Sequence, residues 1–433
     1  MSLPRALLAA FCLTSVILTG CSKNSSNNSN AQMRVVNAFS QANALDVSVN
    51  AKPTVSGLQF QSSSQYTDVD SGSQTVIVNV TGASTSLINT TYNIGSNTKY
   101  NYFIYGPQTA VGALLLADSF TDPGDGFFAV RLVNVAAGPG ALDLYVTAPG
   151  ADLTATAPAI AGTSYASGSL FVSIAKGTSF EIRITPAGTK DVIYDGVPQT
   201  FAEHSGATVV ALGKGSGKLV NVVLLRQDDA GSGALVDNLL TQYKVVNASL
   251  VPSPLNVLVD ASLQLSNIPY TGVSNYQRTS TGTHNFSFEA TTTPGASLLT
   301  LVQTLTAATD TSIVLTGTAG TLKPVVLQDN NLPPPVSTAN VRFVNASADV
   351  AAVDVFINFS KQVSALAINS ASGYVNLSAS ASTGTSYEFD FNLAGTTTPV
   401  LKLTSVLLTA SHTYTVYLAG PAGNLRGIVS QDN

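Results

Sequence analysis

The sequence contains no tryptophan, and only two cysteines and three histidines occur among its 433 residues. So few Cys and His side chains exclude a zinc architecture that draws its ligands from such residues. Charged residues are also scarce, at 10% of the chain, against roughly 25% in an average soluble protein. The net charge of −5 argues against nucleic-acid binding, which needs a basic face. These absences exclude several functions and select none.

The first 20 residues resemble a secretory signal peptide. Arg5 precedes the apolar stretch 6–18, which is shorter than the roughly 20 apolar residues that span a bilayer. The stretch ends in Leu18-Thr19-Gly20-Cys21, a Leu, two small residues and a Cys, and this resembles a bacterial lipobox. The resemblance implies cleavage before Cys21 and lipidation of its thiol. An ordinary cleavable signal with an incidental cysteine is the alternative.

A lipidated Cys21 predicts attachment to a membrane, because acyl chains contribute about 0.8 kcal/mol for each buried CH₂ group. Residues 21–32 are mostly polar, with many Ser and Asn, and are expected to form a flexible tether. Ser22 follows the cysteine where an Asp would stand in an inner-membrane lipoprotein, so the resemblance to Gram-negative lipoproteins implies the outer membrane. We therefore expect a membrane-anchored protein of the bacterial cell envelope. Because Cys12 leaves with the signal, no disulfide can form within the mature chain.

The rest of the chain repeats one pattern four times. Each copy opens with a basic residue and reaches an Asn three positions later, as Arg34 and Asn37, Arg131 and Asn134, Lys244 and Asn247, and Arg342 and Asn345. Nine residues after each Asn stands a further polar residue, which is Asp46, Asp143, Asn256 or Asp354. An alternating apolar run follows each of these, and that period of two is typical of a half-buried strand.

Later in each repeat a Gly precedes a second alternating run. Each repeat closes with a strand, a turn and a strand that ends near an acid, at Asp118, Asp228, Asp329 or Asp432. Dense Ser, Thr and Gly between short strands, with no convincing amphipathic helix, predict an all-β protein. We expect four tandem immunoglobulin-like β-sandwich domains, at 33–121, 127–229, 242–331 and 340–433.

The segments between these domains read as linkers. Residues 121–126 separate the first two domains, 229–233 begin the second junction, and 332–336 hold three consecutive prolines. Because a proline run is stiff and a Gly-Ser run is loose, the spacing predicts a jointed rod that is most rigid at its third joint.

These motifs resemble a known family, the domain of unknown function 4397. The resemblance rests on the R-x-V-N-A opening, the Asp nine residues on, the Tyr66–Gly72 and Tyr276–Gly282 pairs, and the closing G-x-x-G turn. The family implies tandem repeats in bacterial secreted proteins and lipoproteins, and it carries no accepted activity or catalytic residues. The third copy departs from the pattern, with Lys244 and Asn256 in place of Arg and Asp.

We interpret the repeated polar residues as structural anchors, because four repeated polar positions more often fix a fold than a binding site. In the third copy Arg and Asp change together, so we hypothesise the pairs Arg34–Asp46, Arg131–Asp143 and Arg342–Asp354. The alternative is that the Arg pairs with the closing Asp of its repeat, at Asp118, Asp228 or Asp432, which the third copy keeps as Asp329. The recurrent Asn is expected to bond to the backbone in the turn that follows its strand.

Two motifs invite a binding interpretation. The stretch Gly213–Lys218 resembles a phosphate-binding loop but fails the Walker spacing, and it aligns with predicted hairpin turns. Asp122, Asp125, Asp228 and Asp229 lie at junctions where calcium could bind, but two acids at each junction are too few for the roughly six to eight oxygens of a Ca²⁺ site. We predict no metal site and no cofactor.

Signals of catalysis are weak. Glu203 beside His204 is the nearest approach to an acid–base dyad, while His284 and His412 lie in other repeats. No G-x-S-x-G, H-E-x-x-H or nucleophilic Cys is found. Acidic residues recur in the alternating strands as Glu181, Glu289 and Glu388, which suggests a solvent-facing strand position. We therefore expect no catalytic residues and no enzyme, although paired carboxylates could still meet in space.

The sequence thus predicts a lipid-anchored cell-envelope protein with a non-catalytic structural, adhesive or display role. Its expected partners are the membrane and an envelope or extracellular protein or polysaccharide, and no nucleic acid. The alternative is a glycan- or small-ligand-binding surface lipoprotein. Tyr100, Tyr102 and Tyr105 could form an aromatic strip for sugars, but we expect them to divide between core and surface.

Overall fold

The computed structural model describes residues 30–42, 44–107, 110–214, 219–227, 231–307 and 309–433. The predicted signal peptide and Cys21 lie outside these residues. In the described part of the chain the regular elements are all β-strands, and no helix there has the length and apolar character to cross a membrane.

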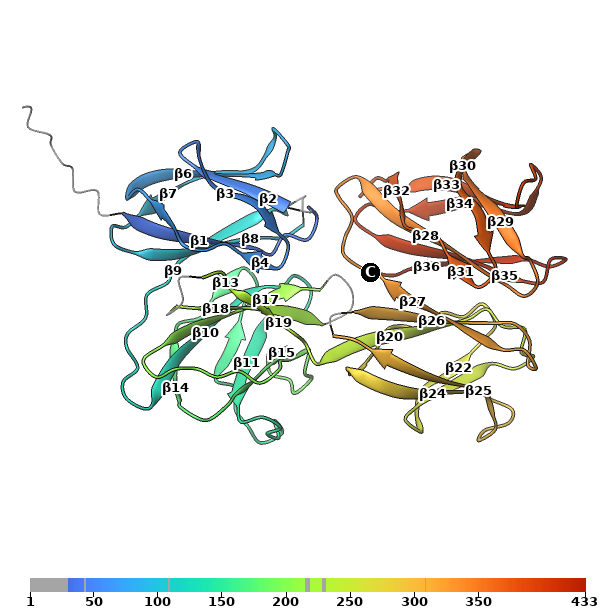
Figure 1. Ribbon diagram of the computed structural model, residues 1–433, viewed down its shortest axis with the longest axis horizontal. Coiled ribbons are helices and arrows are strands. Elements are labelled where there is room, and N and C mark those ends of the chain that lie inside the picture. Colours follow the sequence, from blue (N-terminus) through green and yellow to red (C-terminus); the bar gives the residue numbers. More distant parts are fainter. Residues whose placement is uncertain (1–29, 43, 108–109, 215–218, 228–230, 308) are drawn as a thin grey trace, which may run out of the picture.

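The strands form four β-sandwiches, each made of two sheets, so the predicted all-β sandwich architecture is confirmed (Figure 1). The first sandwich holds β1 (Ala31–Asn37), β2 (Ala44–Val49), β3 (Lys52–Gln59), β4 (Ser62–Ser63), β5 (Thr67–Val69), β6 (Gly72–Val80), β7 (Ser86–Ile94), β8 (Lys99–Tyr105) and β9 (Gly112–Ala117). The second holds β10 (Phe127–Val135), β11 (Leu142–Thr147), β12 (Ile160–Thr163), β13 (Ser167–Gly168), β14 (Val172–Ala175), β15 (Glu181–Pro186), β16 (Tyr194–Asp195), β17 (Gly206–Gly213), β18 (Val220–Arg226) and β19 (Ala234–Val236).

The third and fourth sandwiches repeat this plan. The third consists of β20 (Leu240–Asn247), β21 (Leu255–Val259), β22 (Ser262–Ile268), β23 (Gln277–Ser280), β24 (Gly282–Ala290), β25 (Ser297–Leu305), β26 (Asp310–Thr316) and β27 (Lys323–Asp329). The fourth consists of β28 (Thr338–Ser347), β29 (Ala352–Ile357), β30 (Ser360–Ala367), β31 (Ser370–Ala371), β32 (Val375–Ser378), β33 (Thr385–Leu393), β34 (Pro399–Leu408), β35 (Thr413–Gly420) and β36 (Arg426–Gln431).

Each sandwich has an inner sheet and an outer sheet. The inner sheets contain the opening strand of the repeat and run β4-β1-β8-β9, β13-β10-β17-β18-β19, β23-β20-β26-β27 and β31-β28-β35-β36. The outer sheets run β3-β2-β6-β7, β12-β11-β15-β16, β22-β21-β24-β25 and β30-β29-β33-β34. In every inner sheet the opening strand pairs in parallel with a late strand, as β1 does with β8.

Burial differs between the two kinds of sheet. In β6 of an outer sheet Val76 and Val78 are buried in the sandwich, while the alternate residues are at least partly exposed. The opening strand β1 is buried on both faces instead, because Val35 enters the sandwich core and Val36 packs against the second sandwich. Buried and exposed residues therefore alternate in outer-sheet strands such as β6, whereas an opening strand such as β1 is buried along almost its whole length.

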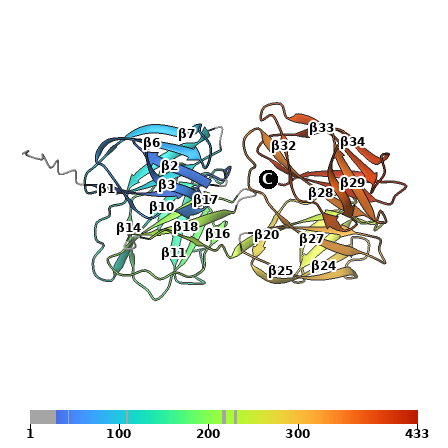
Figure 2. The ribbon, with the colours of Figure 1, turned by 45° about the horizontal axis from the view of Figure 1, so that its top comes forward.

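The inner sheets pack against one another in pairs. The first and second sandwiches meet through an apolar cluster that includes Val36, Phe103, Val133, Val210 and Val223. The third and fourth meet through a corresponding cluster, which includes Val246, Val314, Val344, Tyr417 and Ile428. Figures 1 and 2 show the two pairs side by side, so that the four sandwiches form a two-by-two block. The predicted jointed rod is therefore wrong, because buried apolar faces hold neighbouring domains together.

Polar contacts join the two pairs. Lys214 at the end of β17 donates to Asp310 of β26 at 2.5 Å, and both side chains are buried. Gln41 of the first sandwich donates to the backbone oxygen of Pro334 and to Ser411, both at 3.0 Å. The proline run thus packs against the first sandwich and is no free spacer. The hairpin predicted around 213–218 is present, because Gly213 of β17 pairs with Val220 of β18, although 215–218 lie outside the described residues.

Candidate functional site

The basic anchor of each repeat lies at the contact between two sandwiches. Arg131 of β10 forms an ion pair with Asp118 of the first sandwich, with 2.9 Å from Nη2 to Oδ1. Arg34 of β1 pairs with the other oxygen of the same carboxylate at 3.1 Å. The three side chains, which we call the first ion cluster, are 5% exposed or less. Burial lowers the pKa of Arg131, against the attraction of Asp118.

Each of the two arginines of the first ion cluster also donates a hydrogen bond to the backbone of the other sandwich. Nη1 of Arg131 donates to the backbone oxygen of Ala117 in the first sandwich at 2.8 Å. Nη1 of Arg34 donates to the backbone oxygen of Arg226 in the second sandwich at 3.1 Å. Each guanidinium thus binds a backbone carbonyl oxygen at the end of a closing strand in the other sandwich. These hydrogen bonds give the contact geometric specificity as well as charge pairing.

The third and fourth sandwiches exchange ion pairs in the same way. Arg342 of β28 pairs with Asp329 at the end of the third sandwich at 2.5 Å, and its Nη1 donates to the backbone oxygen of Gln328 at 2.9 Å. Lys244 of β20 forms an ion pair with Asp432 at the end of the fourth sandwich. We call these four residues the second ion cluster.

The closing residue of the second repeat is Gln227 and not Asp228. The backbone N–H of Gln227 donates to Gly206 O, as that of Asp118 donates to Lys99 O in the first repeat. The side chain of Gln227 donates to Asp118, so that one carboxylate serves both arginines of the first ion cluster. Asp228 lies outside the described residues.

An aromatic ring covers each basic anchor, and sequence reasoning missed this role. The rings of Tyr66, Phe171, Tyr276 and Tyr374 lie over Arg34, Arg131, Lys244 and Arg342, with the cation 4.5–5.0 Å from the ring centroid. The hydroxyls of Tyr66 and Tyr276 donate to Asp118 and Asp329, and burial raises the pKa of both tyrosines well above its usual value. The shared spacing of Tyr66 and Tyr276 before a glycine was the signal that could have revealed them.

The second polar position of each repeat has another role, so the hypothesis that pairs it with the Arg is wrong. Asp46 accepts the backbone N–H of Gly57 at 2.7 Å, and Asp143 accepts that of Gly162 at 2.7 Å. Asp354 accepts the N–H of Ala365 at 2.8 Å. These three donors have positive φ and lie where the neighbouring strand shifts register or bends. The carboxylate therefore supports an irregular strand. The alternative, a pair between the Arg and the closing Asp of its own repeat, holds for Arg34 and Asp118, whereas Arg131 and Arg342 pair with the closing Asp of the preceding repeat.

In the third repeat the two anchors that change together have separate partners. Asn256 accepts the N–H of Asn267, which also has positive φ, through its side-chain oxygen at 3.1 Å. An amide oxygen fulfils this role as a carboxylate does. Asn256 thus bonds within its own sandwich, whereas Lys244 pairs with Asp432 in the other sandwich.

The recurrent Asn bonds to backbone as predicted. Each one accepts the N–H of the residue two positions later, as Asn37 does from Phe39 at 2.9 Å. Its amide also donates across the turn, as Asn37 does to Leu58 O at 2.8 Å. All four, Asn37, Asn134, Asn247 and Asn345, are fully buried. The position thus fixes the exit of the opening strand.

The histidine at the first junction lies between two acids. Nδ1 of His204 is 2.7 Å from Asp122 and Nε2 is 3.1 Å from Asp125. The hydrogen bond and charge of Asp122 raise the pKa of His204. Glu203 instead pairs with Lys176 at 2.7 Å, so the two neighbours form no acid–base dyad. Across the described ranges no group of three or more His, Cys, Asp or Glu residues could hold a metal ion.

Two of the recurrent glutamates are buried, contrary to the predicted solvent-facing position. Glu181 accepts the N–H of Gly150, and Glu289 accepts that of Gly295, both at 2.8 Å. Both act as backbone acceptors, which is why burial is tolerated. Asp195 of β16 lies against Glu181, and burial and this second carboxyl group raise the pKa of Asp195 to about 7.

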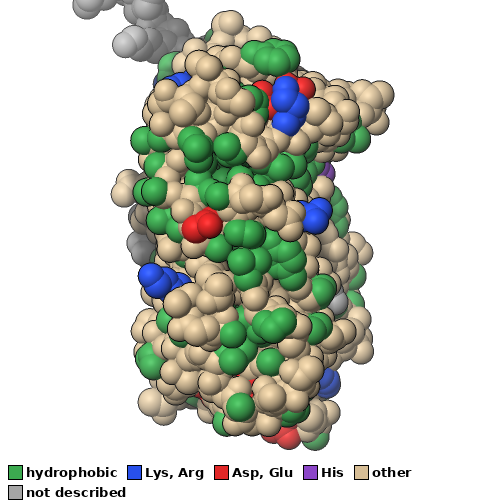
Figure 3. Space-filling model, turned by 90° about the vertical axis from the view of Figure 1, so that its right-hand side faces the viewer, with side chains coloured by type: hydrophobic (Ala, Val, Ile, Leu, Met, Phe, Trp, Pro, Cys, Tyr) green, Lys and Arg blue, Asp and Glu red, His purple; other side chains and the backbone are tan. Residues whose placement is uncertain are grey.

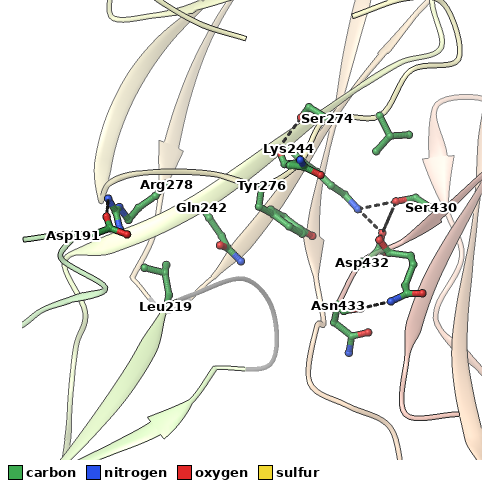
Figure 4. Close-up of a pocket in the computed structure, with 13 residues that line it drawn as sticks. Asp191, Leu219, Gln242, Lys244, Ser274, Tyr276, Arg278, Ser430, Asp432 and Asn433 are labelled. Atoms are coloured by element: carbon green, nitrogen blue, oxygen red, sulfur yellow. Dashed lines mark hydrogen bonds and ion pairs between the residues drawn. The ribbon is translucent and has the colours of Figure 1, made fainter. Parts of the chain in front are cut away.

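A pocket of about 690 Å³ opens where the second, third and fourth sandwiches meet (Figure 4). Its lining includes Lys244 and Asp432 of the second ion cluster, together with Tyr276. The aromatic strip considered above does not form a surface, because Tyr102 is buried in the first core while Tyr100 and Tyr105 are partly buried.

A family model for the domain of unknown function DUF4397 matches residues 31–145, 241–356 and 339–433. The chain belongs to this family. The DUF4397 matches include the opening strands of all four repeats and the basic anchors of both ion clusters. No curated protein matches the sequence.

Two solved structures are similar only at a low level. One is described as alpha-glucan binding by a streptococcal virulence factor, with 11% identity, 42% of this chain and 93% of that chain covered, and a TM-score of 0.17. The other is CBMbc, a family CBM26 module from Eubacterium rectale Amy13K in complex with maltoheptaose, with 12% identity, 47% and 99% coverage, and a TM-score of 0.15. At these TM-scores neither structure indicates what this DUF4397 protein binds.

Proposed function

We propose that this protein is a lipid-anchored component of the bacterial cell envelope with a non-catalytic structural, adhesive or display role. The lipobox ending at Cys21 supports the anchor. The buried basic anchors of all four repeats support the structural role, because Arg34, Arg131, Lys244 and Arg342 are engaged in contacts between sandwiches. Buried ion pairs that hold the domains in one arrangement would keep the outer surface of the protein in a fixed orientation relative to its anchor.

The position of exposed apolar side chains carries the proposal of adhesion. The tethered end is β1, at the left of Figure 1, whereas the third and fourth sandwiches lie at the opposite end. Most of the exposed large hydrophobic side chains of the described residues belong to these two sandwiches, namely Leu263, Val302, Phe359, Leu393, Val400, Leu407 and Val429. Figure 3 shows this end with hydrophobic side chains gathered among few charged ones. Such patches mark interaction surfaces.

Lipidation is tested by expressing the full chain in a Gram-negative host with an alkyne-labelled fatty acid. We expect Cys21→Ser to abolish labelling and to move the protein from the membrane fraction to the soluble fraction. Cys12→Ser is the matched control and should keep both the label and the membrane location. Equal labelling of the wild type and Cys21→Ser would contradict the anchor.

Adhesion is tested by measuring the retention of cells that display the protein on envelope or extracellular-matrix extracts. Phe359 and Leu407 are 77% and 58% exposed, so their replacement by Ser should lower retention without loss of folding. Leu170 of the second sandwich, 87% exposed, provides the control. Equal retention by both sets of variants would refute an adhesive end.

A second candidate function is the binding of a glycan or other small ligand. The pocket of about 690 Å³ supports it, because this volume lies within the ~300–1,000 Å³ of small-molecule sites, which occur preferentially between domains.

A further inference from the structure

We propose that the cleft between the second, third and fourth sandwiches binds a short neutral oligosaccharide. This inference rests on the second candidate function above and names its site and ligand class. We call this site the three-domain cleft. Asp191 and Leu219 come from the second sandwich, Tyr276 and Arg278 from the third, and Asp432 from the fourth (Figure 4).

The charges that line the three-domain cleft neutralise one another in pairs. Asp191 and Arg278 form an ion pair at 2.5 Å and are each a little more than one third exposed, so they occupy the rim. Lys244 and Asp432 form the buried pair of the second ion cluster. An ionic ligand would compete with the existing partner of each of these charges, and displacing a partner costs free energy. The balance of charge therefore favours a neutral ligand.

The remaining polar groups of the cleft suit hydroxyl groups. Asn275 and Gln431 are exposed and line the cleft from opposite sandwiches. A side-chain amide offers two donors and an acceptor, and each sugar hydroxyl likewise both donates and accepts. The amide nitrogen of Gln431 is placed by a hydrogen bond to the backbone oxygen of Asn433 at 2.7 Å.

Tyr276 provides a fixed aromatic ring in the cleft. Its hydroxyl donates to Asp329 at 2.6 Å and accepts from Asn331 at 2.9 Å, which holds the ring in one orientation. Lys244 lies 5.0 Å from the ring centroid. The part of the ring that Lys244 leaves uncovered is the apolar surface against which we expect the C–H groups of a sugar ring to pack. The amides of Asn275 and Gln431 and the ring of Tyr276 thus line the same cleft among three domains.

The first experiment applies the purified full chain to an array of neutral and anionic glycans. We expect binding to neutral oligosaccharides and none to anionic ones. Preferential binding of anionic glycans, or of no glycan, would overturn the ligand class. Titration calorimetry with the best neutral array oligosaccharide then measures the Kd of the wild type.

The second experiment locates the site. Asn275→Ala combined with Gln431→Ala should raise the Kd at least about tenfold, through the loss of two sets of hydrogen bonds. Gln65 precedes Tyr66 as Asn275 precedes Tyr276, and Asn89 is an exposed amide residue of β7 in the same sandwich as Gln65. Gln65→Ala combined with Asn89→Ala is therefore the matched control and should leave the Kd unchanged. If the cleft variant bound as tightly as the wild type, the site would be wrong while glycan binding itself would stand. Complete absence of glycan binding would refute this proposal together with the glycan part of the second candidate function.

Discussion

Asp329 and Arg342 lie only thirteen residues apart in the chain, yet their ion pair joins two separate sandwiches at 2.5 Å. Asp329 ends the closing strand of the third repeat, and Arg342 belongs to the opening strand of the fourth. Asp118 and Arg131 have the same separation and the same relationship in the first pair. The short connection within each pair of sandwiches thus places a buried acid against a buried base. It folds the second repeat back on the first and the fourth back on the third.

Removal of one partner from such a buried pair should be strongly destabilising. We expect Arg342→Ala to lower the free energy of unfolding by about 3–5 kcal/mol, because Asp329 is left buried without its partner. Chemical denaturation followed by circular dichroism measures the change. Lys176→Ala is the control, since its ion pair with Glu203 is exposed and should contribute little. A similar small change in both variants would contradict a structural role of the second ion cluster.

The apolar contact between paired sandwiches should couple their unfolding. Phe103 is fully buried, and its cluster consists of residues from the first and second sandwiches. We expect Phe103→Ala to cost about 3–5 kcal/mol and to separate the thermal transitions of these two sandwiches in differential scanning calorimetry. Phe359→Ala, at an exposed position, should leave the calorimetric profile unchanged. A profile for Phe103→Ala that matched the wild type would show that the sandwiches unfold independently of this contact.

The pair of Asp195 and Glu181 should make stability depend on pH. Burial, followed by the proximity of Glu181, raises the pKa of Asp195 from 3.8 to about 7 in the folded state. The folded protein therefore holds this proton more tightly than the unfolded chain, so that its stabilising contribution is complete below pH 4 and is lost as the pH rises towards 7. We expect Asp195→Asn to remove this part of the pH dependence in denaturation curves recorded between pH 4 and 8. A wild-type carboxyl resonance of Asp195 that titrates near 4 by NMR would disprove the shift.

The acid that supports the irregular strand should tolerate an amide but not an apolar side chain. We expect Asp354→Leu to cost about 1–3 kcal/mol, because the N–H of Ala365 loses its acceptor. Asp354→Asn should cost less, since Asn256 performs this role in the third repeat. Lys361 and backbone N–H groups hold the pKa of Asp354 at about 2, so the loss in Asp354→Leu should not vary above pH 4. Equal stability of the Leu variant and the wild type, measured by urea denaturation, would exclude the proposed support.

The repeats, the all-β class and the turn role of the Asn were accessible to prediction because they depend on local pattern. The alternation of buried and partly exposed residues in strands such as β6 indicates that one face of the strand is buried. The side chain of Asn37 accepts a hydrogen bond from the backbone of Phe39, only two residues along the chain. The rings over the basic anchors were less accessible. Tyr66 and Tyr276 share a spacing before glycine, but their position over Arg34 and Lys244 depends on how the strands pair.

The sequence by itself determined the strands, their fourfold repetition and the polar positions that support each sandwich, since all of these follow from contacts within one repeat. Only the tertiary structure decided that the repeats form a block and which acid each base meets. The reason is that the opening strands are buried on both faces, so that Val36 and Arg34 are satisfied by a neighbouring sandwich. A one-dimensional pattern gives the residues of such a contact but not the partner domain that covers them.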